Sequence, residues 1–288
     1  MGKAMVTGAL GNVGGYVAKH LIANGQEVVV ADIDAAKLQE RYGDKAESVY
    51  FDFTDTNTFS AALQGVDRVF IMRPPHLGKP EELKPFVEAL KAQGSIKLVC
   101  FLSLIGVDKN PVPPHHKIEK YIEQAGLPYC HIRPSFFMQN ISGVHAFEIK
   151  HFDRIVVPVK QALTSFIDAE DIGEITARVL SEPDKHQNRG YSITGPEAID
   201  YHEAAKILSE ELGREITYAN PSPRLSKKYW IEIRGLDKEY STVMGMLYMM
   251  TRLGTAQKVT STFEDIMGKK PQTFRQFVRK NMATWTVN

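Results

Sequence analysis

The sequence has few cysteines, almost no net charge and no long apolar run. Its 288 residues include 2 cysteines, Cys100 and Cys130, which are too few for a disulfide framework and suit a reducing compartment. Long stretches without Asp, Glu, Lys or Arg, such as residues 134–147, are shorter than the roughly 20 apolar residues of a membrane helix. The N-terminal residues carry neither a secretory pattern nor a myristoylation signal. We therefore expect a cytoplasmic protein without a membrane segment.

Charge is balanced, with 35 Lys and Arg against 34 Asp and Glu, so no overall attraction to nucleic acid or anionic lipid is expected. No cluster of His, Cys and carboxylate residues has zinc-ligand spacing, so no metal is predicted. The apolar content of 43% and the length allow one large domain with a smaller appendage.

Short apolar runs alternate with segments of helical length in the first half of the chain. The expected strands are residues 3–7, 27–32, 48–51, 68–72, 97–103 and 129–133, and the expected helices are residues 12–24, 35–42, 55–63, 80–93 and 114–124. Nearly continuous apolar runs such as Val28 to Val30 indicate strands that are buried on both faces. This pattern predicts an α/β fold with a Rossmann-type, doubly wound parallel sheet.

The pattern after Pro134 is less regular. We expect short strands at 165–167 and 191–193, helices at 168–180 and 201–212, and mostly helix from residue 220 onward. The chain is therefore divided into a first domain, residues 1–150, and a smaller, mostly helical C-terminal lobe, residues 151–288, which is partly interleaved with the sheet through the strands near 165 and 191. Methionines at 244, 246, 249 and 250 are read as core packing or as the lining of a substrate pocket.

A glycine motif joins the first strand to the first helix. It places Gly8 at a sharp turn, Gly11 where backbone amides can approach a pyrophosphate, and Gly14 where helix and strand pack closely. The preceding strand and the following amphipathic helix are the context that this motif requires. We expect the loop to bind a dinucleotide, which makes residues 1–150 an NAD(P)-binding domain; a glycine-rich turn without a ligand is the alternative. The expected contacts are Gly8, Leu10, Gly11, Asn12, Val13 and Gly14.

An acidic residue ends the second strand. Asp32 follows Gly14 by 18 residues, where a carboxylate can accept hydrogen bonds from the adenosine ribose hydroxyls. This favours NAD(H) over NADP(H), although Lys37 could swing toward a 2'-phosphate, so NADP(H) stays open. Asp52, after the third strand, is read either as a residue beside the adenine or as a helix cap.

These motifs resemble the atypical short-chain dehydrogenase/reductase superfamily, specifically its NmrA-like group, which includes quinone and triphenylmethane-dye reductases. The resemblance rests on the glycine spacing of residues 7–14, on His116 with the helix that follows, and on the blocks Gly126 to Tyr129, Ile132 to Pro134, Phe166 to Ile172 and Ile193 to Pro196. The group contains both reductases and cofactor-sensing regulators.

The resemblance also implies where the ligand lies. Ligands of such sheets bind outside the carboxyl ends of the strands. The resemblance places the loop from Met72 to Pro75 beside the nicotinamide ribose, and Arg73 could pair with the pyrophosphate or a substrate anion. Further cofactor contacts implied at this edge are Asp52, Phe53, Met72, Arg73, Pro74, Pro134 and Phe136.

The usual catalytic pair of short-chain dehydrogenases is missing, because none of the 11 tyrosines has a lysine four residues later. Hydride transfer to a quinone or dye needs less acid catalysis, since the acceptor delocalises the charge. The candidate catalytic residues are Ser103, His116 and Lys117, the last by resemblance to reductases related to isoflavone metabolism. Each has a structural alternative, such as a helix terminus or a strand end.

The sequence thus predicts an NAD(P)H-dependent oxidoreductase that passes hydride to a small conjugated acceptor in a cleft between lobes. A non-catalytic NAD(P)-sensing regulator is the alternative. A homodimer is compatible with either reading.

Overall fold

The computed structural model describes residues 2–74 and 77–286, so Pro75 of the expected nicotinamide loop lies outside the described residues. The chain forms two compact units. Unit 1 contains the chain up to Pro134 together with Ala169–Ile193 and Asp265–Gly268, and unit 2 contains the remainder. Within the described ranges, no helix combines the length and apolarity needed to cross a membrane.

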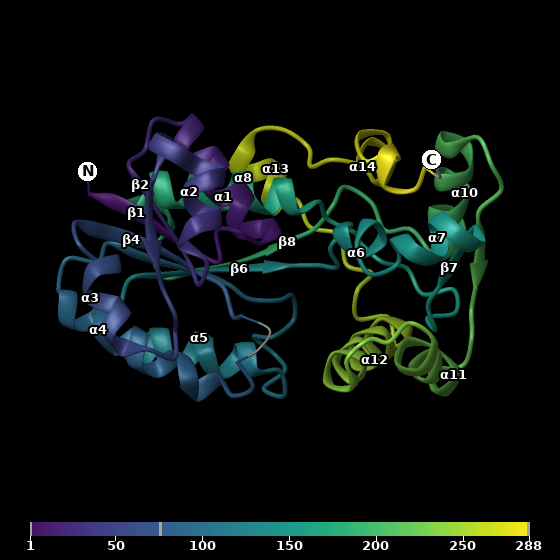
Figure 1. Ribbon diagram of the computed structural model, residues 1–288, viewed down its shortest axis with the longest axis horizontal. Coiled ribbons are helices and arrows are strands. Elements are labelled where there is room, and N and C mark those ends of the chain that lie inside the picture. The colour runs from purple at the N-terminus through teal and green to yellow at the C-terminus, as the bar shows by residue number, and fades with distance from the viewer. Residues whose placement is uncertain (1, 75–76, 287–288) are drawn as a thin grey trace. The chain divides into compact units, whose positions relative to one another are not determined.

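Unit 1 is built on a parallel sheet with the strand order β3-β2-β1-β4-β5-β6-β8 (Figure 1), seven strands within the described residues. Every neighbouring pair is parallel. The strands are β1 Lys3–Thr7, β2 Val28–Asp32, β3 Glu47–Tyr50, β4 Val66–Ile71, β5 Leu98–Leu102, β6 Tyr129–Pro134 and β8 Arg189–Ile193. The predicted Rossmann-type parallel sheet is confirmed.

Helices cover both faces of this sheet. Figure 1 shows α1, α2 and α8 on one face and α3, α4 and α5 on the other. Their bounds are α1 Asn12–Ala23, α2 Ala35–Tyr42, α3 Phe59–Ala62, α4 Lys84–Gln93, α5 Pro114–Gln124 and α8 Ala169–Ser181. Shorter elements of unit 1 are η1 Gly43–Lys45, η2 Thr56–Thr58, η3 Pro80–Leu83 and α9 Pro183–His186.

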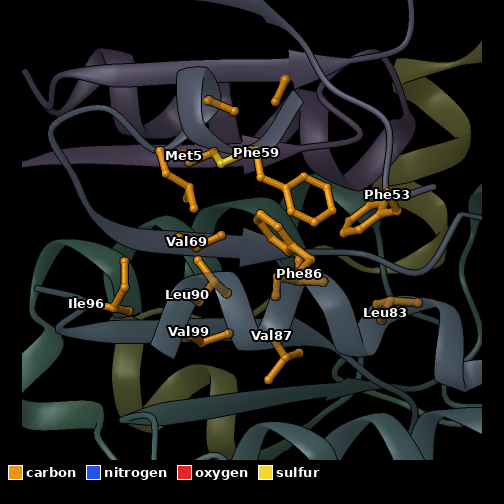
Figure 2. Close-up of a cluster of buried hydrophobic side chains, with 14 of the residues drawn as sticks. Met5, Phe53, Phe59, Val69, Leu83, Phe86, Val87, Leu90, Ile96 and Val99 are labelled. Carbon is orange, nitrogen blue, oxygen red and sulfur yellow. The ribbon is translucent and has the colours of Figure 1, made fainter. Parts of the chain in front are cut away.

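An aromatic cluster fills the core between the sheet and α3 to α5 (Figure 2). Phe86 of α4 is fully buried, and its ring lies 4.8 Å from Phe51, 5.4 Å from Phe53 and 5.1 Å from Phe59. β4 contributes alternate residues to this core, including Val69, because successive side chains of a strand point to opposite faces. Burying each large side chain stabilises the fold by about 2 kcal/mol.

On the opposite face, α1 and α8 pack unusually closely. A Cβ atom on Gly173 of α8 would lie 2.3 Å from the Cβ atom of Tyr16 on α1, so the crossing requires a residue without a side chain. The segment that returns to unit 1 after residue 168 therefore supplies both a cover for α1 and, through β8, the last strand of the sheet.

Unit 2 has its own core around Phe166, Tyr201, Trp230 and Phe274. Its strands β7 Arg154–Val156 and β9 Thr217–Ala219 pair in parallel. Its helical elements are α6 Gln139–Ser142, α7 Ala146–Phe152, α10 Tyr201–Leu212, α11 Pro223–Lys228, the π-helical turn η4 Tyr229–Ile233, α12 Lys238–Arg252, α14 Phe274–Lys280 and η5 Met282–Thr284. The helix α13 Thr262–Met267 begins in unit 2 and ends in unit 1.

The boundary between the units differs in position from the division at residue 150 that the sequence suggests. Residues 135–150 group with unit 2 because Met138, Ile141 and Ile149 are buried in the core of that unit. The expected strand at 165–167 is not formed: Ile167 makes one isolated bridge, with Phe137, and Thr164 makes another, with Ile199. The amides of this segment bond to three separate partners: Ser165 N donates to Ala256 O, Ile167 N donates to Phe136 O, and Thr164 N before them donates to Ile199 O.

Candidate functional site

The candidate site lies in unit 1, at the carboxyl edge of the parallel sheet. β1 is flanked by β2 on one side and by β4 on the other, so the chain changes its direction of winding at β1. In open α/β sheets the crevice beside such a reversal is where ligands bind. The loops that leave β1, β2, β4, β5 and β6 at this edge carry most of the predicted site residues.

The glycine loop after β1 has the geometry of an anion-binding turn. Gly8 has a φ of +62°, which strains any residue with a side chain, and the Gly11 amide donates to the Gly8 carbonyl oxygen at 2.9 Å. A Cβ atom on Gly14 would lie 2.3 Å from the Gly8 carbonyl oxygen, so the start of α1 fits against the loop only without one. The loop and the first turn of α1 are therefore packed backbone against backbone.

The N-terminus of α1 keeps its amide donors available. Gly11 is the N-cap residue, and no side chain among the described residues caps this helix end. Asn12 is exposed, whereas the Val13 side chain is buried, so only the backbone of Val13 can meet a ligand. Free amides together with the positive end of the helix dipole favour a phosphate at this position.

Asp32, the last residue of β2, lies against the same loop. Its Oδ2 atom accepts a hydrogen bond from the Leu10 amide at 3.1 Å, and its Oδ1 atom accepts one from the Ile33 amide at 2.9 Å. The structure thus brings Asp32 and the glycine loop together. Arg41, which the sequence analysis did not consider, reaches the same residue: its Nη1 atom donates to the Leu10 carbonyl oxygen at 3.1 Å.

Asp52 and Phe53 follow β3. Asp52 Oδ1 accepts hydrogen bonds from the amide and the hydroxyl of Thr54, both at 2.8 Å, and so fixes the turn before η2. The helix cap itself is Asp55 and not Asp52. Phe53 is buried in the aromatic cluster. Its side chain is therefore committed to the core, and a role of either residue in cofactor binding stays a prediction.

Met72, Arg73 and Pro74 follow β4. The Met72 side chain packs on Gly8, with its Cγ atom 2.8 Å from where a Cβ on that glycine would be, so this residue also borders the glycine loop. Arg73 is half-buried and donates to the Leu77 carbonyl oxygen, and burial lowers the pKa of its guanidinium. The Pro74 carbonyl oxygen accepts a hydrogen bond from the Leu77 amide at 3.1 Å.

Ser103 and Pro134 lie at the ends of β5 and β6. Ser103 is 4% exposed, and its amide donates to Ile132 O at 2.7 Å. The Pro134 carbonyl oxygen accepts the Ile105 amide at 3.0 Å. Phe136, in contrast, belongs to unit 2, where its ring lies 5.4 Å from that of Tyr248.

The start of α5 carries the other catalytic candidates. His116 Nδ1 donates to the Val107 carbonyl oxygen at 2.8 Å and so holds the preceding loop. Lys117 lies on the exposed face of the helix, with Nζ 3.5 Å from Glu81 Oε1. His115 points inward instead: burial lowers its pKa to about 4, and the nearby positive charge of Arg73 adds to the shift. The sequence analysis could not tell which of the two histidines faces inward.

Below these residues, α5 is tied to β6 by a buried ion pair. Arg133 donates from Nε to Glu119 Oε1 at 2.9 Å and from Nη2 to Glu119 Oε2 at 2.7 Å. Burial, the largest single effect, would raise the pKa of Glu119. The hydrogen bonds from Arg133 and Ser103, together with the charges of His131 and Arg133, jointly leave the pKa below its ordinary value. The pair therefore fixes α5 relative to the strand ends.

Glu119, Glu123 and His131 also bring three ligand-type atoms within 4.8 Å of one another, although the sequence spacing does not suggest a metal site. Both carboxylates already hold cations, because Arg133 binds Glu119 and Lys120 Nζ lies 2.6 Å from Glu123. We assign no metal to this cluster.

Curated relatives match the chain over nearly its whole length. An uncharacterized oxidoreductase, YesF, of Bacillus subtilis is 30% identical over 98% of this chain and 96% of its own. The prestalk A differentiation protein A of Dictyostelium discoideum is 31% identical over 97% of this chain and 92% of its own. An NAD(P)H azoreductase of Xenophilus azovorans is 25% identical over 98% of both chains.

Solved structures share the fold. Quinone oxidoreductase QOR2 of Escherichia coli, crystallised with NADPH, superposes with a TM-score of 0.88 at 22% identity over 97% of this chain and 99% of its own. Triphenylmethane reductase of Citrobacter sp., complexed with NADP(H), gives a TM-score of 0.86 at 19% identity over the same shares of the two chains. The model of the NmrA-like family matches residues 2–278. The chain therefore belongs to the NmrA-like family.

Proposed function

We propose that this chain is an NAD(P)H-dependent reductase that transfers hydride to a small conjugated acceptor such as a quinone or an azo or triphenylmethane dye. The observation that carries the proposal is the glycine loop at the change of winding direction, with the uncapped N-terminus of α1 behind it and Asp32 beside it. The names of the oxidoreductase and azoreductase relatives support the same chemistry.

The residues at the sheet edge fit a nicotinamide dinucleotide. The loop can lie against its surroundings in this way only because both positions are glycine: a Cβ atom on Gly8 would meet Met72, and one on Gly14 would meet the Gly8 carbonyl oxygen. Backbone amides of Asn12 and Val13 would hold the pyrophosphate, and Asp32 the adenosine ribose. When bound, the reduced nicotinamide supplies the hydride.

The chain's own contribution is chiefly positioning. It lacks the tyrosine and lysine pair that protonates carbonyl substrates in typical short-chain dehydrogenases. A conjugated acceptor needs less acid catalysis, because the electron pair that arrives with the hydride is delocalised over the acceptor. For a quinone, hydride addition gives a hydroquinone anion, and one proton completes the reduction.

That proton comes from water or from one of the candidate residues. Ser103 offers a buried hydroxyl at the end of β5. His116 donates its Nδ1 proton to the Val107 carbonyl oxygen, so its Nε2 atom can supply a proton only when the ring is cationic, and Lys117 would have to leave Glu81.

NADH is the proposed preferred cofactor. The Asp32 carboxylate can accept hydrogen bonds from the ribose hydroxyls, and its negative charge repels a phosphate at the same place. Lys37, the cation that the sequence offered against this preference, is held by Asp34, with Nζ 2.9 Å from Oδ2. A cytoplasmic location and a homodimer remain proposals; the first is supported by two free thiols, which suit a reducing compartment.

Steady-state oxidation of NADH and NADPH with a panel of quinones, azo dyes and triphenylmethane dyes tests the function. A reductase shows saturable turnover with at least one acceptor class. Tight dinucleotide binding without turnover on any acceptor would reject the reductase in favour of a cofactor-sensing regulator. Absence of dinucleotide binding would reject both.

A further inference from the structure

Arg41 presents a guanidinium group to the glycine loop from the last turn of α2. Its Nη1 atom donates to the Leu10 carbonyl oxygen at 3.1 Å. Its Nη2 atom lies 2.5 Å from where a Cβ atom on Gly15 would be, so the bare backbone of α1 at Gly15 makes room for the group. The cation therefore lies beside the loop and the first turn of α1.

Tyr42, the next residue, holds this end of α2 against the loop. Its hydroxyl donates to the Ala9 carbonyl oxygen at 2.6 Å, and the Arg41 guanidinium lies 5.5 Å from the centre of the Tyr42 ring. Two consecutive side chains of α2 thus reach two consecutive carbonyl groups of the loop. This attachment keeps Arg41 at the loop even though its side chain is exposed.

Arg41 carries a charge that its neighbours leave uncompensated. Across residues 2–74 and 77–286, no carboxylate lies within ion-pair distance of its guanidinium, whereas Lys37 on the same helix is paired with Asp34. Both oxygens of Asp32 already accept backbone amides, from Leu10 and Ile33. An exposed, unpaired guanidinium next to a dinucleotide loop is suited to a phosphate, which it can bind through two parallel hydrogen bonds.

Building on the proposed function, we propose that Arg41 binds the 2'-phosphate of NADP(H) and thereby keeps NADPH usable despite Asp32. The group that would hold the phosphate is thus at the far end of α2, and Lys37 at its start is not involved. Asp32 and Arg41 act in opposite directions on one choice: the carboxylate favours the free ribose of NADH, and the guanidinium offsets its repulsion of a phosphate.

Adenosine fragments test this role without any turnover. Calorimetric titrations with adenosine 2',5'-bisphosphate and with 5'-AMP measure the contribution of the 2'-phosphate to binding, because the two fragments differ in that group. The titrations are done with the intact chain and with the variants Arg41→Gln and Lys37→Gln. We expect Arg41→Gln to raise the dissociation constant of the bisphosphate at least tenfold, or about 1.4 kcal/mol. The dissociation constant of 5'-AMP should change less than twofold. Lys37→Gln, which removes a paired cation from the same helix, should change neither.

Other outcomes overturn the proposal. If Arg41→Gln loses affinity equally for both fragments, the residue only shapes the loop through Leu10. If Lys37→Gln loses affinity for the bisphosphate alone, the phosphate is held at the start of α2. Failure of the unmodified chain to bind 5'-AMP and NADH would instead remove the proposed function itself. Thermal melting of each variant verifies that it is folded, which is expected because Arg41 and Lys37 are exposed.

Discussion

Glu119 of α5 and Arg133 of β6 form a two-point ion pair beneath the carboxyl edge of the sheet, with both carboxylate oxygens engaged. The Glu119 side chain is 2% exposed and that of Arg133 is 14% exposed. Removing one partner of such a pair leaves the other charge buried and uncompensated. The pair is therefore a sensitive point of the scaffold that carries Ser103 and His116.

We expect Glu119→Gln to lower the free energy of unfolding by about 3 kcal/mol, because Arg133 then loses both of its close hydrogen bonds to a carboxylate and keeps only Asp108, 4.0 Å from Nη1, as a counter-ion. Urea unfolding measures the change. Glu182→Gln is the matched control, since Glu182 pairs with Arg178 on the surface of unit 1, and it should cost less than about 0.5 kcal/mol. Similar losses in the two variants would show that the burial of the first pair has no energetic consequence.

His131 should make the stability depend on pH. Burial lowers its pKa to about 4, whereas a histidine in an unfolded chain titrates near 6.5. Between these values the unfolded chain binds a proton that the folded chain does not, so the free energy of unfolding falls as the pH drops from about 6.5 toward 4. Urea unfolding over this window should give a shallower pH slope for His131→Phe.

The control for this slope is His202→Phe. His202 also contacts a tyrosine ring, 4.9 Å from Tyr218, but it is exposed, whereas His131 stacks on Tyr129 at 4.6 Å and is fully buried. An unchanged slope in His131→Phe, or an equal change in both variants, would contradict a specific contribution of the buried imidazole.

The crossing of α1 and α8 predicts opposite effects for two glycine substitutions. Gly173→Ala should lower the unfolding free energy by about 2 kcal/mol, because the new methyl group would overlap Tyr16. Gly245→Ala, in α12, meets no atom within 4 Å and should raise it by about 0.5 kcal/mol through better helix propensity. Thermal unfolding of both variants tests this prediction. If both substitutions stabilise the protein, α1 and α8 can move apart without a loss of stability.

Asp32 should govern the choice between the two nicotinamide cofactors. In Asp32→Ala the repulsion of a 2'-phosphate disappears, so we expect the ratio of kcat/KM for NADPH to that for NADH to rise at least tenfold. Asp55→Asn serves as the control, because Asp55 is a carboxylate of unit 1 that caps η2. If the ratio is the same in Asp32→Ala and the unmodified chain, the carboxylate does not distinguish the free ribose of NADH from the phosphorylated ribose of NADPH.

Local sequence patterns predict unit 1 well because several of its strands contain apolar runs buried on both faces, such as Val28 to Val30 and Val69 to Ile71. The expected helix at 35–42 and the one at 114–124 coincide with α2 and α5. The pattern fails where structure depends on partners distant in sequence. β7 and β9 have three residues each and stabilise one another across 60 residues, so neither run is distinctive alone.

The site shows the same division. The glycine loop and Asp32 follow from strand, turn and helix signals, and the structure places them in contact. Arg41 is 31 residues from Leu10, and no periodicity indicates that its long side chain runs back along α2 to the loop. The methionines of α12 also divide: Met244 is buried, whereas Met246, Met249 and Met250 are exposed, because only one stripe of the helix faces the core.

The return of residues 169–193 to unit 1 has a consequence for synthesis on the ribosome. The nascent chain can form β1 to β6 early, but α1 lacks its covering helix and β6 keeps an open edge until α8 and β8 emerge. Unit 2 begins within this interval. The sheet is therefore still incomplete when the first residues of unit 2 are synthesised. The nascent chain most needs protection from aggregation during this interval.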